Sequence, residues 1–377
     1  MNQSPWQLRI YDKALGFKGF VGDAEVSAKP CFNDTPTLTI KLDADHYAAP
    51  KLAAAGARVV AYRHGRAVMS GPVKLQSVAG LAEGGVLTFT LEGDFRLLKN
   101  ILAFPVADHT VTGATVNDQD VEYRSITAPA ETVVKTIIAE NLARIGGAFA
   151  AKFQIATDEG RGATIKSTFR MHAPYDRLFP AVEQAGLGVS VLQVGDKIVI
   201  DVYEPRVYPH VLSVENGTLA DGSGTLSIPT LTRAVVGGQG EGTARTFKQY
   251  KDAAREAEYG DIIEQLVDAR DSSSGDVYAE RAAEALAEGA PKAGFSLTLL
   301  ESDSFTYGPD GVLEGDLVTV KIGALEVTDI IREVPLTWDK DGDTATPTVG
   351  DHPENPARRL INMVRKLATG EKDRKAR

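Results

Sequence analysis

The sequence has 377 residues, enough for two or three domains with separate hydrophobic cores. Hydrophobic residues make up 43% and charged residues 24%, as in ordinary soluble proteins, and no apolar run reaches the roughly 20 residues of a membrane span. The single Cys31 excludes a disulfide framework and a thiolate metal cluster. The N-terminus lacks the pattern of a signal peptide, so we expect the protein to fold in a cytosol.

The charge is distributed unevenly along the chain. Residues 357–377 carry eight Arg or Lys against Glu371 and Asp373, a local charge of +6. Because the net charge is −10, residues 1–356 carry −16. A body this acidic should repel nucleic acid. Solubility through net charge is the simpler explanation of the same imbalance.

Residues 6–100 are predicted to be mostly β. Short stretches alternate apolar and polar residues with period two, and Gly-rich links separate them. The predicted strands are Leu8–Tyr11, Thr37–Leu42, Val59–Tyr62, Val73–Val78 and Leu87–Leu91. Only residues 45–55 look helical. Strands of this length predict a small antiparallel barrel or sandwich.

Residues 104–210 are predicted to form a separate α+β unit. A helix start at Thr127–Glu131 combines a capping hydroxyl, a proline and an early carboxylate, and an apolar helical face follows from Val133 to Ile145. A second helix is predicted over residues 174–185, with Pro180 expected to bend or restart it. A hairpin is predicted over residues 188–203.

From residue 211 onward the pattern becomes β-rich again, with one helix predicted over residues 276–288. The hairpin near residues 313–342 resembles the one at residues 54–78. Each has a glycine, an apolar-alternating run, a small-residue turn and a second run. The order of β unit, α+β insertion and similar β unit predicts an internal repeat.

The sequence contains no strong catalytic or metal-binding signature. Its six histidines are scattered, and neither HExxH nor GxSxG occurs. Gly237–Gly242 does not match GxGxxG, and we predict a turn there. Residues 339–343 begin like a calcium loop, but Thr344 and Gly350 stand where Gly and Glu are required, which favours a hairpin turn. We therefore predict no metal and no cofactor, although a carboxylate pair for glycoside cleavage would leave no sequence spacing.

Several stretches resemble the tail hub (baseplate hub) proteins of long-tailed phages of the siphophage type. "LRIYDKALGF", "TPTLTIKLDADH", "GARVVAYRHGRAVMSGPV" and "GVLTFTLEGDFRLLKN" resemble the opening domain of that family. "VGGQGEGTARTFKQY", "YGDIIEQLVDARD", "LEGDLVTVKIGALEVTDIIREVPLTWD" and "TPTVG" resemble its second half. The motifs are individually weak, and their order over nearly the whole chain carries the resemblance.

The resemblance implies an architecture related to contractile-phage baseplate hubs, mainly β with an α+β insertion. The implied divisions are a first tube-type antiparallel β-barrel at 1–103, a peripheral α+β insertion domain at 104–210, a second tube-type β-barrel with an associated helix at 211–352, and a basic C-terminal helix and tail at 353–377. The repeated hairpins would then be the same part of a duplicated barrel.

The implied function is that of a structural virion protein at the tail tip, not an enzyme. Three chains would form a pseudo-sixfold ring that docks on a hexameric distal tail protein ring and contacts other tail-tip or fibre proteins. DNA would pass through its lumen without specific binding. Two alternatives stay open: a tail-associated cell-wall hydrolase and a host-surface binding module.

The basic C-terminal segment is predicted to be an amphipathic helix. Asn355 and Pro356 suit its start and Gly370 its end, with an apolar stripe and basic residues between them. The stripe should be buried, against either the second barrel of the same chain or a neighbouring tail protein. The candidate partner-contact residues are Arg358, Arg359, Leu360, Val364, Arg365, Lys366 and Leu367.

Overall fold

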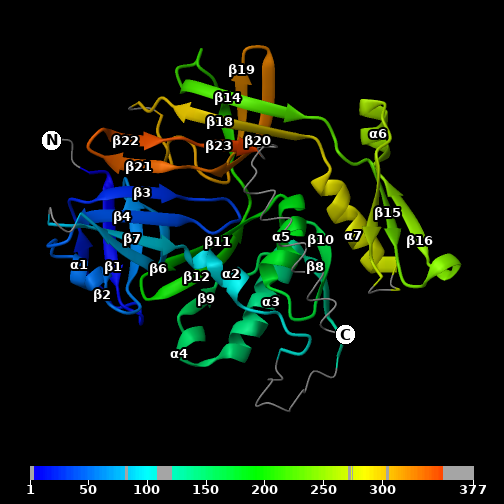
Figure 1. Ribbon diagram of the computed structural model, residues 1–377, viewed down its shortest axis with the longest axis horizontal. Coiled ribbons are helices and arrows are strands. Elements are labelled where there is room, and N and C mark those ends of the chain that lie inside the picture. Colours follow the sequence, from blue (N-terminus) through cyan, green and yellow to red (C-terminus); the bar gives the residue numbers. More distant parts are fainter. Residues whose placement is uncertain are drawn as a thin grey trace. The chain divides into compact units, whose positions relative to one another are not determined.

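The computed structural model describes residues 4–80, 84–107, 121–270, 273, 275–302 and 305–350. The fold is mainly β, with several sheets and short helices (Figure 1). The described residues divide into two compact units, one within residues 4–222 and 297–349 and the other within residues 223–296. The predicted helix of residues 353–377 lies outside the described residues.

A nine-stranded sheet in the first unit has the order β2-β1-β5-β6-β7-β4-β3-β21-β22. Its strands are β1 (Trp6–Tyr11), β2 (Phe17–Val21), β3 (Glu25–Lys29), β4 (Thr37–Asp43), β5 (Arg58–Arg63), β6 (Arg66–Ala79), β7 (Val86–Glu92), β21 (Leu336–Asp339) and β22 (Gly342–Ala345). All five strands predicted before residue 100 are present. The helical prediction for residues 45–55 shrinks to α1 (Ala49–Leu52). The last two strands in this order come from the far end of the chain: β21 pairs with β3, and β22 pairs with β21 (Figure 1).

The middle of the first unit combines helices with two small sheets. Its elements are η2 (Asp94–Arg96), α2 (Leu97–Asn100), β8 (Arg124–Pro129), α3 (Ala130–Ile145), α4 (Gly147–Ala150), β9 (Phe153–Ile155), β10 (Thr164–Phe169), α5 (Pro174–Gln184), β11 (Gly188–Val194) and β12 (Lys197–Tyr203). One apolar core joins α3, α5, β11 and β12 with residues of η2 and α2. The 188–203 hairpin is confirmed. The predicted apolar face of α3 is buried as far as Leu142, whereas Ile145 is 38% exposed.

In this region the predicted cap at Thr127 was wrong, and the helix does not restart at Pro180, whereas a bend at Pro180 stays a prediction. Thr127 belongs to β8 and caps no helix, because the N-cap position is Pro129 and makes no side-chain capping bond. Pro180 lies inside α5, which remains one helix. A proline inside a helix removes a single main-chain donor, and packing of a buried helix can offset that loss. The apolar side of α5, with Leu178, Phe179 and Val182, is buried.

A six-stranded sheet has the order β13-β19-β20-β23-β18-β14. Its strands are β13 (Val207–Leu212), β14 (Leu219–Ser227), β18 (Lys292–Leu299), β19 (Leu317–Ile322), β20 (Leu325–Glu333) and β23 (Thr348–Gly350). β14 and β18 continue into the second unit. The hairpin predicted near residues 313–342 forms β19 and β20.

The second unit contains a three-stranded sheet with the order β16-β15-β17. Its elements are β15 (Arg233–Gly237), η3 (Gly242–Ala244), β16 (Phe247–Lys251), α6 (Ala253–Tyr259), β17 (Glu264–Asp268) and α7 (Gly275–Glu288). α7 packs on the sheet, and Tyr278 enters the core. A Cβ at Gly238 would lie 1.7 Å from the Tyr278 hydroxyl oxygen, so this glycine allows close packing of the predicted turn.

The strand order of the first sheet is repeated in the six-stranded sheet. Without β2, β21 and β22, the first order is β1-β5-β6-β7-β4-β3, and the second is β13-β19-β20-β23-β18-β14. Numbered along the chain within each set, both orders read 1-4-5-6-3-2. The two sets differ in the direction of one strand: β1 runs antiparallel to β5, whereas its equivalent β13 runs parallel to β19.

The pairing register repeats as well. Arg63 pairs with Arg66 at the first hairpin turn, and Ile322 pairs with Leu325 at the second, each residue 259 positions later. Val73 pairs with Leu91, and their counterparts 258 positions later, Ile331 and Val349, also pair. The two sets therefore share order and register. Within the described residues no sheet closes on itself, so the predicted barrels are not confirmed.

Candidate functional site

The predicted partner-contact residues cannot be located on the fold. Arg358, Arg359, Leu360, Val364, Arg365, Lys366 and Leu367 all lie outside the described residues. The functional features below therefore come from other parts of the chain: a buried charge network, a small cavity and the open edges of the sheets.

The charge network surrounds the turn between β5 and β6. The Arg63 side chain is 1% exposed, and its Nη2 donates to Asp343 at 2.5 Å and to Glu301 at 3.1 Å. Its Nη1 donates to the main-chain oxygen of Tyr307 at 2.9 Å. An arginine in this position satisfies two carboxylates and a carbonyl at once. The network fastens the first hairpin turn to residues more than 200 positions later.

Arg66 continues the network on the other side of the turn. Its Nη2 donates to Glu314 at 2.7 Å, and the Tyr307 hydroxyl donates to the same carboxylate. Burial raises the pKa of Tyr307 well above its usual value. Burial also raises the pKa of Asp343, and the hydrogen bond from Arg63 only partly offsets that rise. These groups are held in fixed pairs, an arrangement suited to binding two parts of the chain together.

A second buried network joins the first sheet to β11. Arg58 Nη2 donates to Asp94 at 2.5 Å, and the Ser70 hydroxyl donates to the same carboxylate at 2.6 Å. The main-chain N–H of Gln193 donates to Ser70 Oγ at 2.7 Å. Nearby, Asn33 bonds the main chain of β11 through the N–H of Val189 at 2.8 Å. The hairpin β11–β12 is therefore held on the sheet by polar contacts with specified geometry.

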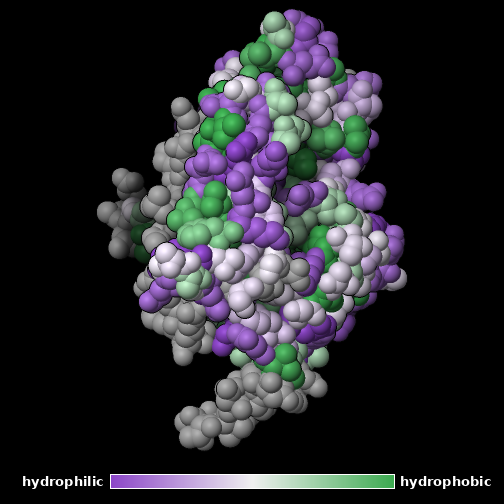
Figure 2. Space-filling model, turned by 90° about the vertical axis from the view of Figure 1, so that its right-hand side faces the viewer, coloured by the Kyte–Doolittle hydropathy of each residue, from purple (hydrophilic) through white to green (hydrophobic). Residues whose placement is uncertain are grey.

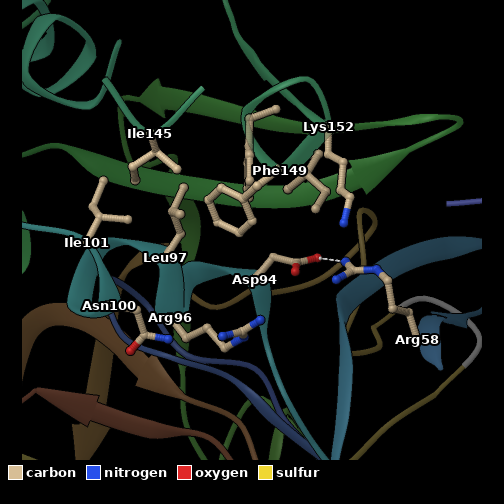
Figure 3. A pocket seen from close by; sticks show the side chains of 11 residues that line it. Arg58, Asp94, Arg96, Leu97, Asn100, Ile101, Ile145, Phe149 and Lys152 are labelled. Carbon is tan, nitrogen blue, oxygen red and sulfur yellow. Dashed lines mark hydrogen bonds and ion pairs between the residues drawn. The ribbon is translucent and has the colours of Figure 1, made fainter. Parts of the chain in front are cut away.

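A cavity of about 390 Å³ lies beside this second network. Figure 3 shows Ile145, Leu97 and Ile101 at one end, and Lys152 near the Arg58–Asp94 pair at the other. Its described lining contains no histidine or cysteine. The only carboxylate in this lining, Asp94, is already bonded to Arg58 and Ser70. The cavity therefore offers an apolar wall and a basic end, without an arrangement for catalysis.

Exposed apolar side chains are spread over several sheets. On the face in Figure 2, hydrophobic residues form separate green patches among mostly hydrophilic ones. In the second unit, Phe247, Ile262 and Leu266 are each more than half exposed. In the first unit, Leu75 is 63% exposed and Val78 49%. These last two lie on β6, beyond the part that pairs with β5.

The part of the chain that the structure describes contains no group of three or more His, Cys, Asp or Glu placed to hold a metal ion. None of the helices in these same residues is both long and apolar enough to cross a membrane. The stretch that begins like a calcium loop forms the turn between β21 and β22, as predicted.

None of these features was predicted as a site from the sequence. Arg63 and Arg66 flank a predicted turn, and their partners Glu301, Asp343 and Glu314 lie 238 to 280 residues away. Local patterns carry no information about pairs so distant. The repeat was the one usable signal, since it indicated that two hairpins occupy equivalent positions.

The fold is similar to those of phage tail proteins. A comparison with curated proteins finds no match. Among solved structures, the 43 kDa tail protein of prophage MuSo2 from Shewanella oneidensis has 12% identity and a TM-score of 0.57, covering 92% of this chain and 98% of that one. Prophage tail protein gp18 from Listeria monocytogenes EGD-e has 12% identity and a TM-score of 0.55, covering 96% and 99%. The tail protein from Neisseria meningitidis MC58 has 13% identity and a TM-score of 0.55, covering 92% and 96%.

These similarities extend over almost the full length of each chain and show a shared fold. The predicted resemblance to phage tail proteins, made from short motifs in order, is confirmed by the family comparison. The family model begins at residue 7 and ends at residue 351, so it spans both strand sets and the segment between them. The chain belongs to the Siphovirus ReqiPepy6 Gp37-like protein family.

Proposed function

We propose that this protein is the structural hub of a phage tail tip, in which three chains form a ring around a channel. The observation that carries the proposal is the repeated strand order, 1-4-5-6-3-2, in two sets of one chain. A chain with two equivalent β units lets three copies present six similar positions. Such a ring matches a hexameric distal tail protein ring on one face while it keeps threefold symmetry.

The proposed division of the chain follows the repeat. Residues 1–103 and 211–352 supply the two tube-type units, and residues 104–210 lie at the periphery. Residues 353–377 would contact a neighbouring hub chain or the next tail protein. The sheets formed by the described residues are open, so we expect closure into barrels to use strands from neighbouring copies.

The charge of the chain suits a channel that DNA crosses without binding. Residues 1–356 carry −16, and an acidic wall repels phosphate at short range. We expect acidic side chains to outnumber basic ones on the channel wall.

The proposed role is structural. In the charge network, Glu301 and Asp343 both accept hydrogen bonds from Arg63. A general acid and a nucleophile need access to substrate, whereas these groups hold two parts of the chain together.

Electron microscopy of tails that contain this chain tests the proposal. We expect three copies in one ring at the tail tip, with the two strand sets alternating around the axis. A different copy number, a position along the tube or in a fibre, or a channel wall rich in Arg and Lys would overturn it. Zymography with the full chain should show no clearing, and clearing would revive the hydrolase alternative.

A further inference from the structure

In each of the two six-strand sets, the chain extends into a β-hairpin, which we call an arm. The outer strand of one of the two arms pairs with another strand of the same chain. The second arm is the hairpin β21–β22, which pairs along β3 of the first sheet. Leu336 lies opposite Ala28 and Trp338 opposite Val26. Leu336 is fully buried, and Val26 and Ala28 are almost fully buried. With this arm in place, β3 is an interior strand of the first sheet and not an edge strand.

The first arm is a similar hairpin, but its strand β7 pairs with β4 of its own sheet, and the outer edge of its strand β6 has no strand partner among the described residues. It consists of residues 73–79 of β6 and 86–91 of β7. Val78 pairs with Leu87, and Leu336 pairs with Ala345. Both members of the second pair come 258 positions later in the sequence, so Val78 and Leu336 are equivalent residues. Leu336 is 0% exposed, whereas Val78 is 49% exposed. The side chain at this equivalent position is therefore buried where the strand pairs with β3 and exposed where the strand has an unpaired edge.

One edge of the first arm is free within the described residues. β5 pairs with β6 only as far as Pro72, and from residue 75 to residue 79 the strand pairs with β7 alone. The side chains of residues 74–79 are exposed. A β edge with apolar residues such as Leu75 and Val78 is a ready template for another strand.

The strand that would receive the first arm is also open. β3 and β14 hold the same place at the end of their strand sets. β3 lies between β4 and β21, whereas β14 has β18 as its sole strand neighbour among the described residues. Leu226 on β14 is 50% exposed. The first arm and β14 of one chain do not pair with each other in these described sheets.

We infer that the first arm of one copy pairs along β14 of a neighbouring copy, as the second arm pairs along β3 within the chain. The inference rests on the proposed ring and names the contact that would join its chains. Strand addition at an open edge supplies main-chain hydrogen bonds, and Val78 would be covered as Leu336 is. The contact joins two different surfaces, so it runs head to tail and can close into a ring.

Cross-linking of the full chain tests the contact. In a Cys31→Ser background, Val78→Cys and Leu226→Cys are placed in one chain, assembled into tails and treated with a short bismaleimide. We expect covalent species of two and three chains and none larger. Mixing the two single variants should give dimers only, and neither single variant alone should cross-link. The control pair is Val78→Cys with Val194→Cys, since Val194 is 59% exposed on the β11–β12 turn.

The outcomes separate the contact from the ring. If the hub contains three chains but the test pair reacts no better than the control pair, the ring stands and the arm contact is wrong. If Leu226→Cys cross-links to itself, β14 meets β14 and the contact is overturned. If the test pair cross-links but its covalent series ends at another number, the arm contact is supported and the trimer is wrong. An absence of assemblies in tails overturns both.

Discussion

The β5–β6 and β19–β20 turns occupy equivalent positions in the two strand sets, but their side chains have different surroundings. Arg63 and Arg66 flank the first turn and are held by acidic residues of the same chain. At the positions 259 residues later, Ile322 is half-buried and Leu325 is 50% exposed. One turn is anchored by ion pairs inside the chain, and the other presents apolar side chains outward.

This difference between a charged and an apolar turn shows that two copies of a fold can keep the same strand order while their turns make different kinds of contact. A charged contact inside one chain forms once, during folding, and its geometry is fixed by several hydrogen bonds. An apolar turn is suited to a contact between chains, because a partner that covers it removes its apolar surface from water. Four experiments test this contrast, from the largest expected loss of stability to the smallest.

Arg63→Ala should cause the largest loss. It leaves Asp343 and Glu301 as neighbouring carboxylates with their shared arginine removed, and losing one partner of a buried pair costs about 3–5 kcal/mol. Urea unfolding of the isolated chain measures the change. Lys41→Ala is the matched control, because Lys41 and Glu25 are about half exposed and 3.9 Å apart. An exposed pair of this kind contributes about 0–1 kcal/mol. Equal losses for the two variants would contradict the anchoring role.

Leu336→Ala and Val78→Ala compare the two arms directly. Leu336 is fully buried, so its truncation should cost about 2–5 kcal/mol in the isolated chain. Val78 is half exposed, and its truncation should change the stability of the isolated chain by less than about 0.5 kcal/mol. Thermal unfolding of both variants measures the contrast. A large loss for Val78→Ala would show that the first arm already has a partner within the chain.

Asp343→Asn tests the charged turn by pH. The pKa of Asp343 in the folded chain is raised above the ordinary 3.8, so the folded state holds this proton more tightly than the unfolded state. Its contribution to stability is therefore fully present below pH 3.8 and is lost as pH rises through the folded value. The stability of the wild type relative to the variant should fall over that window, by about 1.4 kcal/mol for each unit of pKa displacement. A flat difference between pH 3 and 6 would contradict the shift.

Leu325→Asp should have the smallest effect on the isolated chain and a clear effect on assembly. An exposed turn residue changes stability by less than about 0.5 kcal/mol, but a charge in a contact between chains is not readily desolvated. We expect normal unfolding and a hub that fails to form in tails. Val194→Asp, on an exposed turn of the segment proposed to be peripheral, should assemble normally. Failure of both variants would point to a general effect of added charge.

Much of the fold followed from local sequence pattern. The alternation in residues 37–42 predicted a strand with Leu38, Ile40 and Leu42 on one face, and all three are buried. The apolar spacing from Val133 to Ile145 predicted α3. Predictions were weaker where tertiary contacts decide. Thr127 has the chemistry of a helix cap, but pairing with Lys166 places it in a strand.

The site features depended on distant contacts and could not be predicted in the same way. Glu131 was interpreted as a favourable carboxylate at a helix start, yet it is fully buried and bonded to Lys135 and Arg161. The pairing of β3 with β21 joins residues about 310 positions apart. The repeat predicted two equivalent hairpins, and the fold was needed to show the two arms and which of their edges are paired.

The docking of β21 on β3 has a consequence for synthesis of the protein on the ribosome. Residues 25–29 emerge early, but the strand that covers them comes from residues 336–339. At about 5–20 residues per second, translation of the chain between them takes about 15–60 s. During that interval β3 is an uncovered edge on a nascent chain. Its partner arm could be supplied by a neighbouring nascent chain on the same messenger, so the spacing of ribosomes along that messenger should affect how much protein folds correctly.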